Sequence, residues 1–234
     1  MADVFLSVVL PCHNQADHIA DVLRGYRAPM EAIGRPYELI VVPNACTDHT
    51  EAEVAGVAHE DPAVRVVASR QGGWGLAVRQ GLDAADGEVL CYTNTARTLP
   101  KNIPPLLDMY LGHAPCVAKV RREKRQAPAR AVGSWLYNLE ARLLFGSRTT
   151  DVNGTPKILS RALYRDLKLR SDGDLIDLEL IAKVTRRGIP VFEVSVEGFQ
   201  RHGGRTTTNL ASAWKMYTGA IRLRRELSNG QVGP

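Results

Sequence analysis

Short apolar runs alternate with helix-like segments along the first half of the chain, and this alternation limits the possible folds more than any other feature. Residues 4–10 and 37–42 are apolar runs rich in β-branched residues, and a proline follows each. Such runs, without polar alternation, are typical of strands buried on both faces of a parallel sheet. The segments after them, 15–26 and the one opening at 47–51, have helical spacing or capping residues. A parallel α/β sheet with right-handed crossovers is therefore predicted.

The pattern continues, and polar residues follow each predicted strand. Residues 64–68 and 87–92 are the third and fourth predicted strands, and a glycine-rich turn with a helix lies between them. Because the carboxyl ends of parallel strands meet at one edge, the loops near these ends are expected to form a single ligand-binding rim. The four loops are residues 11–14, 43–46, 72–75 and 93–97.

The sequence pattern of the second half of the chain indicates fewer helices and strands. A fifth strand is expected at 116–120, a helix at about 129–145, an irregular polar turn at 151–157 and a helix at 175–187. Residues 190–196 alternate in polarity, which favours an edge strand or one with an antiparallel neighbour.

The domain organisation follows from these elements. One α/β domain is expected over residues 1–205, with an amphipathic helix and tail over 206–234. The apolar side of segment 210–227 either packs back on the domain or lies on an anionic membrane, because the rest of its surface is basic.

Composition limits where the protein acts. Hydrophobic residues make up 44% of the chain, yet no uninterrupted apolar run approaches the roughly 18 to 20 residues that cross a bilayer. The amino terminus lacks the basic segment of a signal peptide, so a cytoplasmic location is expected. The four cysteines are scattered without metal-ligand spacing and are expected to be free thiols: Cys12, Cys46, Cys91 and Cys116.

Charge is distributed unevenly. The net charge is +5, and six basic residues lie within 119–130 against a single glutamate. This cluster fits a phosphate, a membrane surface or a plain solvated loop. The basic residues are not interleaved with stacking aromatics, which argues against nucleic acid as a partner.

The ordered motifs resemble a known family. Residues 6–15 and 37–50 resemble the first two strands of family-2 glycosyltransferases of the GT-A fold, and 72–81 is similar to their glycine-rich turn and helix. In the second half the resemblance is to one branch, the polyprenyl-phosphate or dolichyl-phosphate sugar synthases. The segments that carry it are 151–157, 176–180, 193–196 and 201–205.

The resemblance implies a nucleotide-sugar donor lying across the ends of the first strands. Here Gln15 and Asn44 replace acidic residues of the family, so the identity of the base is not carried over, and His13 serves equally well as a structural residue at a strand end. The residues implied in donor binding are Pro11, His13, Asn14, Gln15, Asn44, Gly73, Arg79, Asn94, Arg201 and Arg205.

The largest departure concerns a metal. Relatives carry Asp-x-Asp after the fourth strand, whereas Asn94 and Ala96 stand there in this chain. Since Mg²⁺ and Mn²⁺ prefer carboxylate oxygens, a conventional metal site is not expected, and Asn94 is the one candidate ligand left in the motif. Arg97 follows, and its guanidinium offers charge and bidentate hydrogen bonds to a departing diphosphate. The alternative is that Arg97 is an ordinary surface residue and donor binding has been lost.

The acceptor implied by this branch is a lipid monophosphate, which is already a nucleophile. The resemblance places its cationic ligands at Arg121 or Arg122 and at Arg130. A hydroxyl acceptor would need a carboxylate base, for which Asp177 is the first candidate and Asp151 the second.

The function expected from the sequence is an inverting transfer of a sugar from a nucleotide sugar to a polyprenyl phosphate, in the cytoplasm or at the inner face of the membrane. Two alternatives stay open. One is transfer to a soluble natural product or metabolite, and the other is a silent GT-A domain that binds a nucleotide or a partner protein. The sequence does not indicate an oligomeric state.

Overall fold

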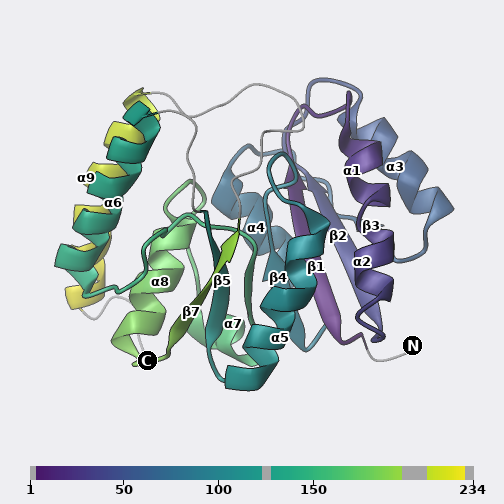
Figure 1. Ribbon diagram of the computed structural model, residues 1–234. Helices are drawn as coiled ribbons and strands as arrows, with labels where there is room; N and C mark the ends of the chain where they lie inside the picture. The colour runs from purple at the N-terminus through teal and green to yellow at the C-terminus, as the bar shows by residue number, and fades with distance from the viewer. Residues whose placement is uncertain (1–3, 123–127, 197–209, 230–234) are drawn as a thin grey trace.

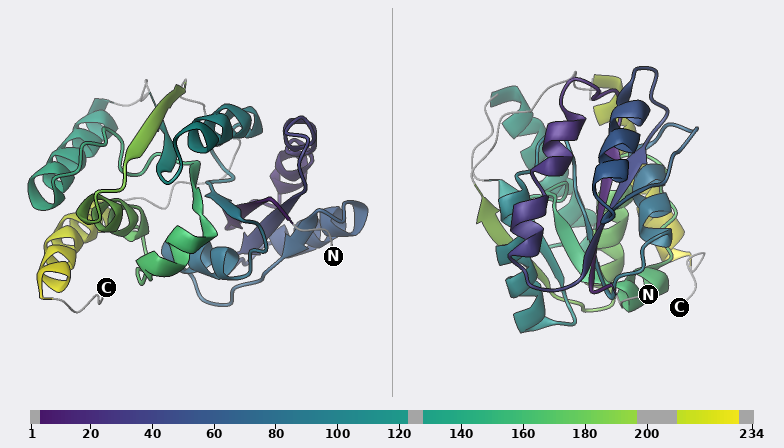
Figure 2. Two further views of the ribbon diagram at one scale, coloured as in Figure 1. Left: turned by 90° about the horizontal axis from the view of Figure 1, so that it is seen from below. Right: turned by 90° about the vertical axis from the view of Figure 1, so that its right-hand side faces the viewer.

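A computed structural model describes residues 4–122, 128–196 and 210–229 of the chain (Figure 1). A twisted sheet lies at the centre, and helices cover both of its faces (Figures 1 and 2). Within the described residues the sheet contains seven strands in the order β3-β2-β1-β4-β6-β5-β7. The strands are β1 (Leu6–Cys12), β2 (Tyr37–Pro43), β3 (Val64–Val66), β4 (Val89–Tyr92), β5 (Val117–Arg122), β6 (Lys157–Ser160) and β7 (Val191–Val196).

The helices connect these strands and cover the sheet. They are α1 (Ile19–Arg24), α2 (Arg27–Glu31), α3 (Thr50–Glu60), α4 (Trp74–Asp83), η1 (Pro100–Asn102), α5 (Ile103–His113), α6 (Pro128–Phe145), α7 (Arg161–Leu167), α8 (Ile176–Arg186) and α9 (Leu210–Ser228).

One strand runs against the others. β1 pairs in parallel with β2 and β4, β2 with β3, and β5 with β7. β6 is antiparallel to both of its neighbours, β4 and β5. The carboxyl ends of β1, β2, β4 and β5 and the amino end of β6 therefore lie at one edge of the sheet, called here the carboxyl edge.

The core explains why the first strands show no polar alternation. Val8 and Val9 are both fully buried, and they belong to hydrophobic clusters on opposite faces of the sheet. One cluster includes residues of α1, α3 and α5, and the other includes residues of α4 and α6 to α9. Gly81 lets α4 pack closely, because a Cβ atom there would lie 2.2 Å from Cγ1 of Val9.

The first half of the fold matches the sequence prediction, and the second half corrects it. The turn predicted at 151–157 leads into β6, whose first residue, Lys157, is fully buried. Helices α5 and α7 were not predicted. β7 lies at the edge of the sheet as expected, but its neighbour β5 is parallel to it.

The carboxy-terminal helix packs on the domain along its described part. Ala220, Leu223 and Leu227 of α9 are buried in the core cluster, and the Tyr217 hydroxyl donates to the Gly133 carbonyl of α6 at 2.9 Å. The predicted boundary between 205 and 206 lies outside the described residues. Within the described parts of the chain, none of the helices is long and apolar enough to cross a membrane.

Candidate active site

The loops predicted to converge do meet at the carboxyl edge. His13 Nδ1 lies 2.7 Å from the carbonyl oxygen of Asn44. The side chain of Asn14, whose φ is +48°, bonds both the amide and the hydroxyl of Thr47. The loops after β1 and β2 therefore form one fixed surface, in which His13 is exposed and Pro11 is buried.

Asn44 has a different contact from the one predicted. Its carboxamide nitrogen donates to the Gly73 carbonyl at 3.1 Å, and its oxygen accepts from the Gly73 amide at 3.2 Å. The side chain thus joins the end of β2 to the glycine-rich turn before α4. Gly73 is required there because its φ is +155° and a Cβ atom would lie 2.5 Å from the Asp172 carbonyl oxygen. Asn44 therefore positions the turn.

Arg79 is also engaged inside the protein. Its guanidinium forms an ion pair with Asp172 and donates to the Leu169 carbonyl at 3.5 Å. The Asp172 carbonyl in turn accepts the backbone amide of Leu76 at 2.9 Å. These contacts hold segment 169–172 against the start of α4, so a donor contact by Arg79 would have to replace an existing ion pair.

The turn after β4 is held by its own threonines. The Thr95 hydroxyl contacts the Pro11 carbonyl at 3.0 Å and Gln15 Oε1 at 2.9 Å, and the hydroxyls of Thr93 and Thr98 lie 2.5 Å apart. Gln15 is only 5% exposed. Gln15 therefore holds the turn through Thr95 from inside the protein. The sequence had suggested instead that it contacts the donor.

The same turn does not suit a divalent cation. Asn94 Oδ1 accepts the Ala96 amide at 2.9 Å, and Ala96 is a buried methyl group. Among the described residues no three histidines, cysteines or acidic groups gather as metal ligands would. A neutral carboxamide already used by the backbone is a poor ligand for Mg²⁺ or Mn²⁺. Arg97, which is half-buried, is a positive residue of the same turn.

Asp177, the first candidate for a general base, lies in a buried network. Its Oδ1 accepts the Tyr92 hydroxyl at 2.8 Å and forms an ion pair with Lys157, and its Oδ2 accepts Trp74 Nε1 at 3.3 Å. Asp177 is 4% exposed and Lys157 is fully buried. Burial lowers the pKa of Lys157 to about 8, although the charge of Asp177 opposes this change. A buried carboxylate that already accepts from three donors is poorly placed to take a proton from an acceptor, so the geometry argues against that prediction.

The second candidate base is no more accessible. Asp151 is 3% exposed, and its carbonyl accepts the Gly154 amide at 2.8 Å. Asp174 is the acidic residue that the sequence reasoning missed. It lies just before α8, and desolvation of its carboxyl by the surrounding protein, together with the charge of Asp177, raises its pKa. Its spacing of three residues from Asp177 was the available signal.

A second buried ion pair supports the end of β5. Lys119 Nζ lies 2.9 Å from Glu193 Oε1, and Glu193 also accepts hydrogen bonds from Thr149 and Thr150. Burial alone would raise the pKa of Glu193, but Lys119 and the threonines outweigh it and lower the pKa to about 2. Lys119 is fully buried and is therefore a structural part of the basic segment.

The predicted acceptor ligands are only partly described. Arg121 is exposed at the end of β5, and its guanidinium donates to Ser195 Oγ at 2.6 Å and 3.2 Å. The side chains of Arg122 and Arg130, like Arg201 and Arg205 as a whole, lie outside the described residues.

Comparison with known proteins identifies the family. The model of glycosyl transferase family 2 matches residues 7–167, from β1 to the end of α7. The chain belongs to glycosyl transferase family 2. This family-2 member therefore carries Asn94 and Ala96 in place of the Asp-x-Asp motif.

Similar proteins include transferases of lipid-linked sugars. The undecaprenyl-phosphate 4-deoxy-4-formamido-L-arabinose transferase of Edwardsiella ictaluri is 28% identical over 152 residues, which cover 62% of this chain and 44% of that protein. The Pseudomonas fluorescens protein of the same name is 25% identical over 84% of this chain and 54% of its own length. Glycosyltransferase AglJ of Haloferax volcanii is 26% identical over 87% of this chain and 65% of its own. This family-2 chain thus spans about half to two thirds of these relatives.

Solved structures show the same fold. Glucosyl-3-phosphoglycerate synthase from Mycobacterium tuberculosis, in complex with Mn²⁺, UDP and glucosyl-3-phosphoglycerate, matches with a TM-score of 0.71 and 20% identity. The match covers 95% of this chain and 79% of that one. The predicted GT-A fold is thereby confirmed for this family-2 member.

Proposed function

We propose that this chain transfers a sugar from a nucleotide-sugar donor to a polyprenyl phosphate at the inner face of a membrane, with inversion at the anomeric carbon. The observation that carries the proposal is the carboxyl edge itself. Three polar loops and Arg97 lie at its one end, and the exposed guanidinium of Arg121 lies at the end of β5. The relatives named for undecaprenyl-phosphate transfer support the acceptor class.

The donor is proposed to lie across the loops after β1, β2 and β4. Exposed His13 would contact the base or ribose, and the half-buried Arg97 would contact the diphosphate. Asn14, Gln15, Asn44 and Gly73 hold these loops in place through the hydrogen bonds described above. The donor would therefore meet a rigid surface, which favours catalysis by positioning.

The chemistry needs no base if the acceptor is a phosphate. A phosphate monoester carries a nucleophilic oxygen with negative charge, so attack on the anomeric carbon forms the new C–O bond as the bond to the diphosphate breaks. Asp177 already accepts from three donors inside the protein. This supports a phosphate as the acceptor, because a hydroxyl acceptor would require an accessible base. Arg97 would stabilise the charge that develops on the departing diphosphate.

A test of the acceptor site uses Arg121. The Arg121→Ala variant is expected to raise the KM for a short-chain polyprenyl phosphate by about tenfold or more, with a smaller change in kcat, because a charge-assisted contact to the phosphate is lost. Initial rates with a panel of nucleotide sugars in detergent measure this. Arg165→Ala is the matched control, since Arg165 is an exposed arginine on α7, which follows the far end of β6.

Two outcomes would contradict the proposal. Transfer to 3-phosphoglycerate or another soluble acceptor, but not to a polyprenyl phosphate, would favour the alternative that glucosyl-3-phosphoglycerate synthase illustrates. Binding of a nucleotide without any transfer or hydrolysis of its sugar would indicate a silent domain.

A further inference from the structure

Helix α6 is apolar on two opposite sides. Tyr137, Ala141 and Phe145 are buried in the core cluster. On the other side, at helical spacing, four large apolar side chains are exposed: Val132 (58%), Trp135 (62%), Leu136 (44%) and Leu143 (76%). We call these four residues the outer face of α6. A helix on the surface of a globular protein normally has one apolar stripe, so a second one points to a partner.

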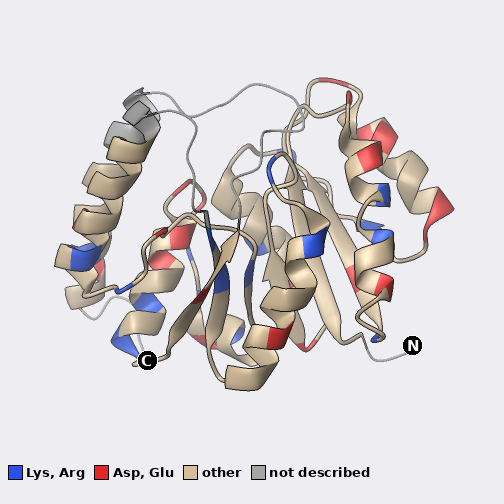
Figure 3. Ribbon diagram, viewed as in Figure 1, with Lys and Arg blue, Asp and Glu red and all other residues tan. Residues whose placement is uncertain are grey.

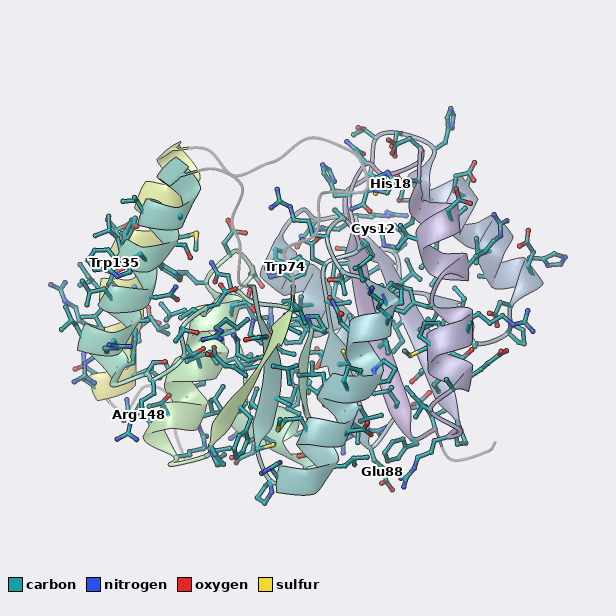
Figure 4. All side chains as sticks on the ribbon, in the orientation of Figure 1. Cys12, His18, Trp74, Glu88, Trp135 and Arg148 are labelled. Atoms are coloured by element: carbon teal, nitrogen blue, oxygen red, sulfur yellow. The ribbon has the colours of Figure 1, made fainter. Side chains whose placement is uncertain are left out.

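The exposed apolar residues of the described chain are concentrated here. Among the side chains that the structure describes, only Val66 and Leu111 of the large exposed hydrophobic residues lie elsewhere, and Ile221 lies on α9, which packs beside α6. Figure 4 shows Trp135 on α6 at the outer margin of the molecule, away from Trp74 and Cys12.

The charges beside this face indicate what covers it. Arg142 lies two helical turns from Trp135 on the same side of α6, and Figure 3 shows few charged positions along the rest of the helix. Further exposed arginines are Arg148, directly after α6, and Arg222, Arg224 and Arg225 of α9. The acidic residues on these two helices are Glu140 and Glu226. An apolar stripe bordered by Arg142, with further exposed arginines on the neighbouring helix α9, is complementary to an anionic bilayer, whereas a second copy would bring two basic surfaces together.

We propose that the outer face of α6 binds the surface of a bilayer that contains anionic lipid, with Trp135, Leu136 and Leu143 in the interface. This deepens the proposed function and rests on it for its purpose, because a polyprenyl phosphate is held in a membrane. Helix α6 is the next helix in the chain after β5, the strand that ends at Arg121 and Arg122. The membrane contact that the sequence suggested for 210–227 is thus assigned to a different helix.

Vesicle sedimentation of the full chain, without donor or acceptor, tests this surface. The protein is expected to sediment with vesicles of phosphatidylcholine and phosphatidylglycerol and far less with phosphatidylcholine alone. Combining Trp135→Ser with Leu143→Ser should lower the partition coefficient by about tenfold or more, since two large apolar side chains no longer enter the interface. The double variant Val66→Ser and Leu111→Ser is the control, because it removes two exposed apolar residues elsewhere.

The outcomes separate this surface from the proposed function. If the protein does not sediment with anionic vesicles, or if both double variants sediment equally, the proposal that the outer face of α6 binds the bilayer is wrong. The proposal would also be wrong if light scattering showed that the protein is a dimer and that Trp135→Ser with Leu143→Ser makes it a monomer. In that case the outer face of α6 would bind a second copy of the chain. Sedimentation as expected in a protein that transfers no sugar would leave the surface standing and refute the proposed function. Transfer in detergent should be unchanged in the α6 variant, whose thermal unfolding confirms that it is folded.

Discussion

Replacing Arg97 with alanine is expected to lower kcat/KM for sugar transfer by about 100-fold to 1,000-fold, which is the usual cost of removing one fixed donor from a developing negative charge. The turn that carries Arg97 is held by Thr95 and by the Asn94–Ala96 hydrogen bond, so the backbone at Arg97 is fixed before the donor arrives. No carboxylate of an Asp-x-Asp motif is present to recruit a cation in its place.

The comparison variants make this result specific. Arg97→Lys should recover part of the rate, because the charge is kept while the bidentate geometry is lost. Lys101→Ala, which removes an exposed cation four residues further along, should leave kcat/KM unchanged. Initial rates at saturating acceptor measure all three. Near-normal activity of Arg97→Ala would remove Arg97 from the proposed mechanism.

The second large effect concerns stability. Asp177→Ala is expected to lower the free energy of unfolding by about 3 to 5 kcal/mol, because it leaves the charge of Lys157 buried without its partner. The Tyr92 hydroxyl and Trp74 Nε1 lose the same acceptor. Urea unfolding followed by circular dichroism measures the change.

Two further variants separate a structural role of Asp177 from a catalytic one. Combining Asp177→Leu with Lys157→Met should recover much of the lost stability, since replacing both members of a buried pair is far less costly than removing one. Asp177→Asn keeps an acceptor for Tyr92 and is expected to stay folded and retain transfer to a polyprenyl phosphate. A folded Asp177→Asn protein with kcat lowered by orders of magnitude would restore Asp177 as a general base.

The parts of the fold that the sequence predicted are those with strong local signals. The runs before Pro11 and Pro43 are buried on both faces and could be recognised without any partner. β6 could not be recognised, because it has four residues and begins with a lysine. The charge of Lys157 is stabilised there by Asp177, twenty positions away, and such long-range compensation leaves no local pattern.

At the candidate site, too, contacts between distant segments could not be predicted from the sequence. The sequence predicted that these loops meet at one edge of the sheet, since strand ends and polar residues are local features. It did not show that the Asn44 carboxamide is used by the backbone of Gly73, or that Arg79 is paired with Asp172. These roles depend on which segments meet in space. The sequence also did not show which side of α6 is exposed. Both sides of the helix are apolar, and only the packing of the folded protein distinguishes them.

The central claim is that Arg97, and no divalent cation, neutralises the diphosphate at the end of β4. The direct measurement is the initial rate of sugar transfer by metal-stripped protein in excess EDTA, compared with the rate in Mn²⁺ or Mg²⁺. Since the turn offers the cation no carboxylate, the rates are expected to agree within about twofold. Loss of transfer in EDTA, restored by Mn²⁺ or Mg²⁺, would contradict the claim.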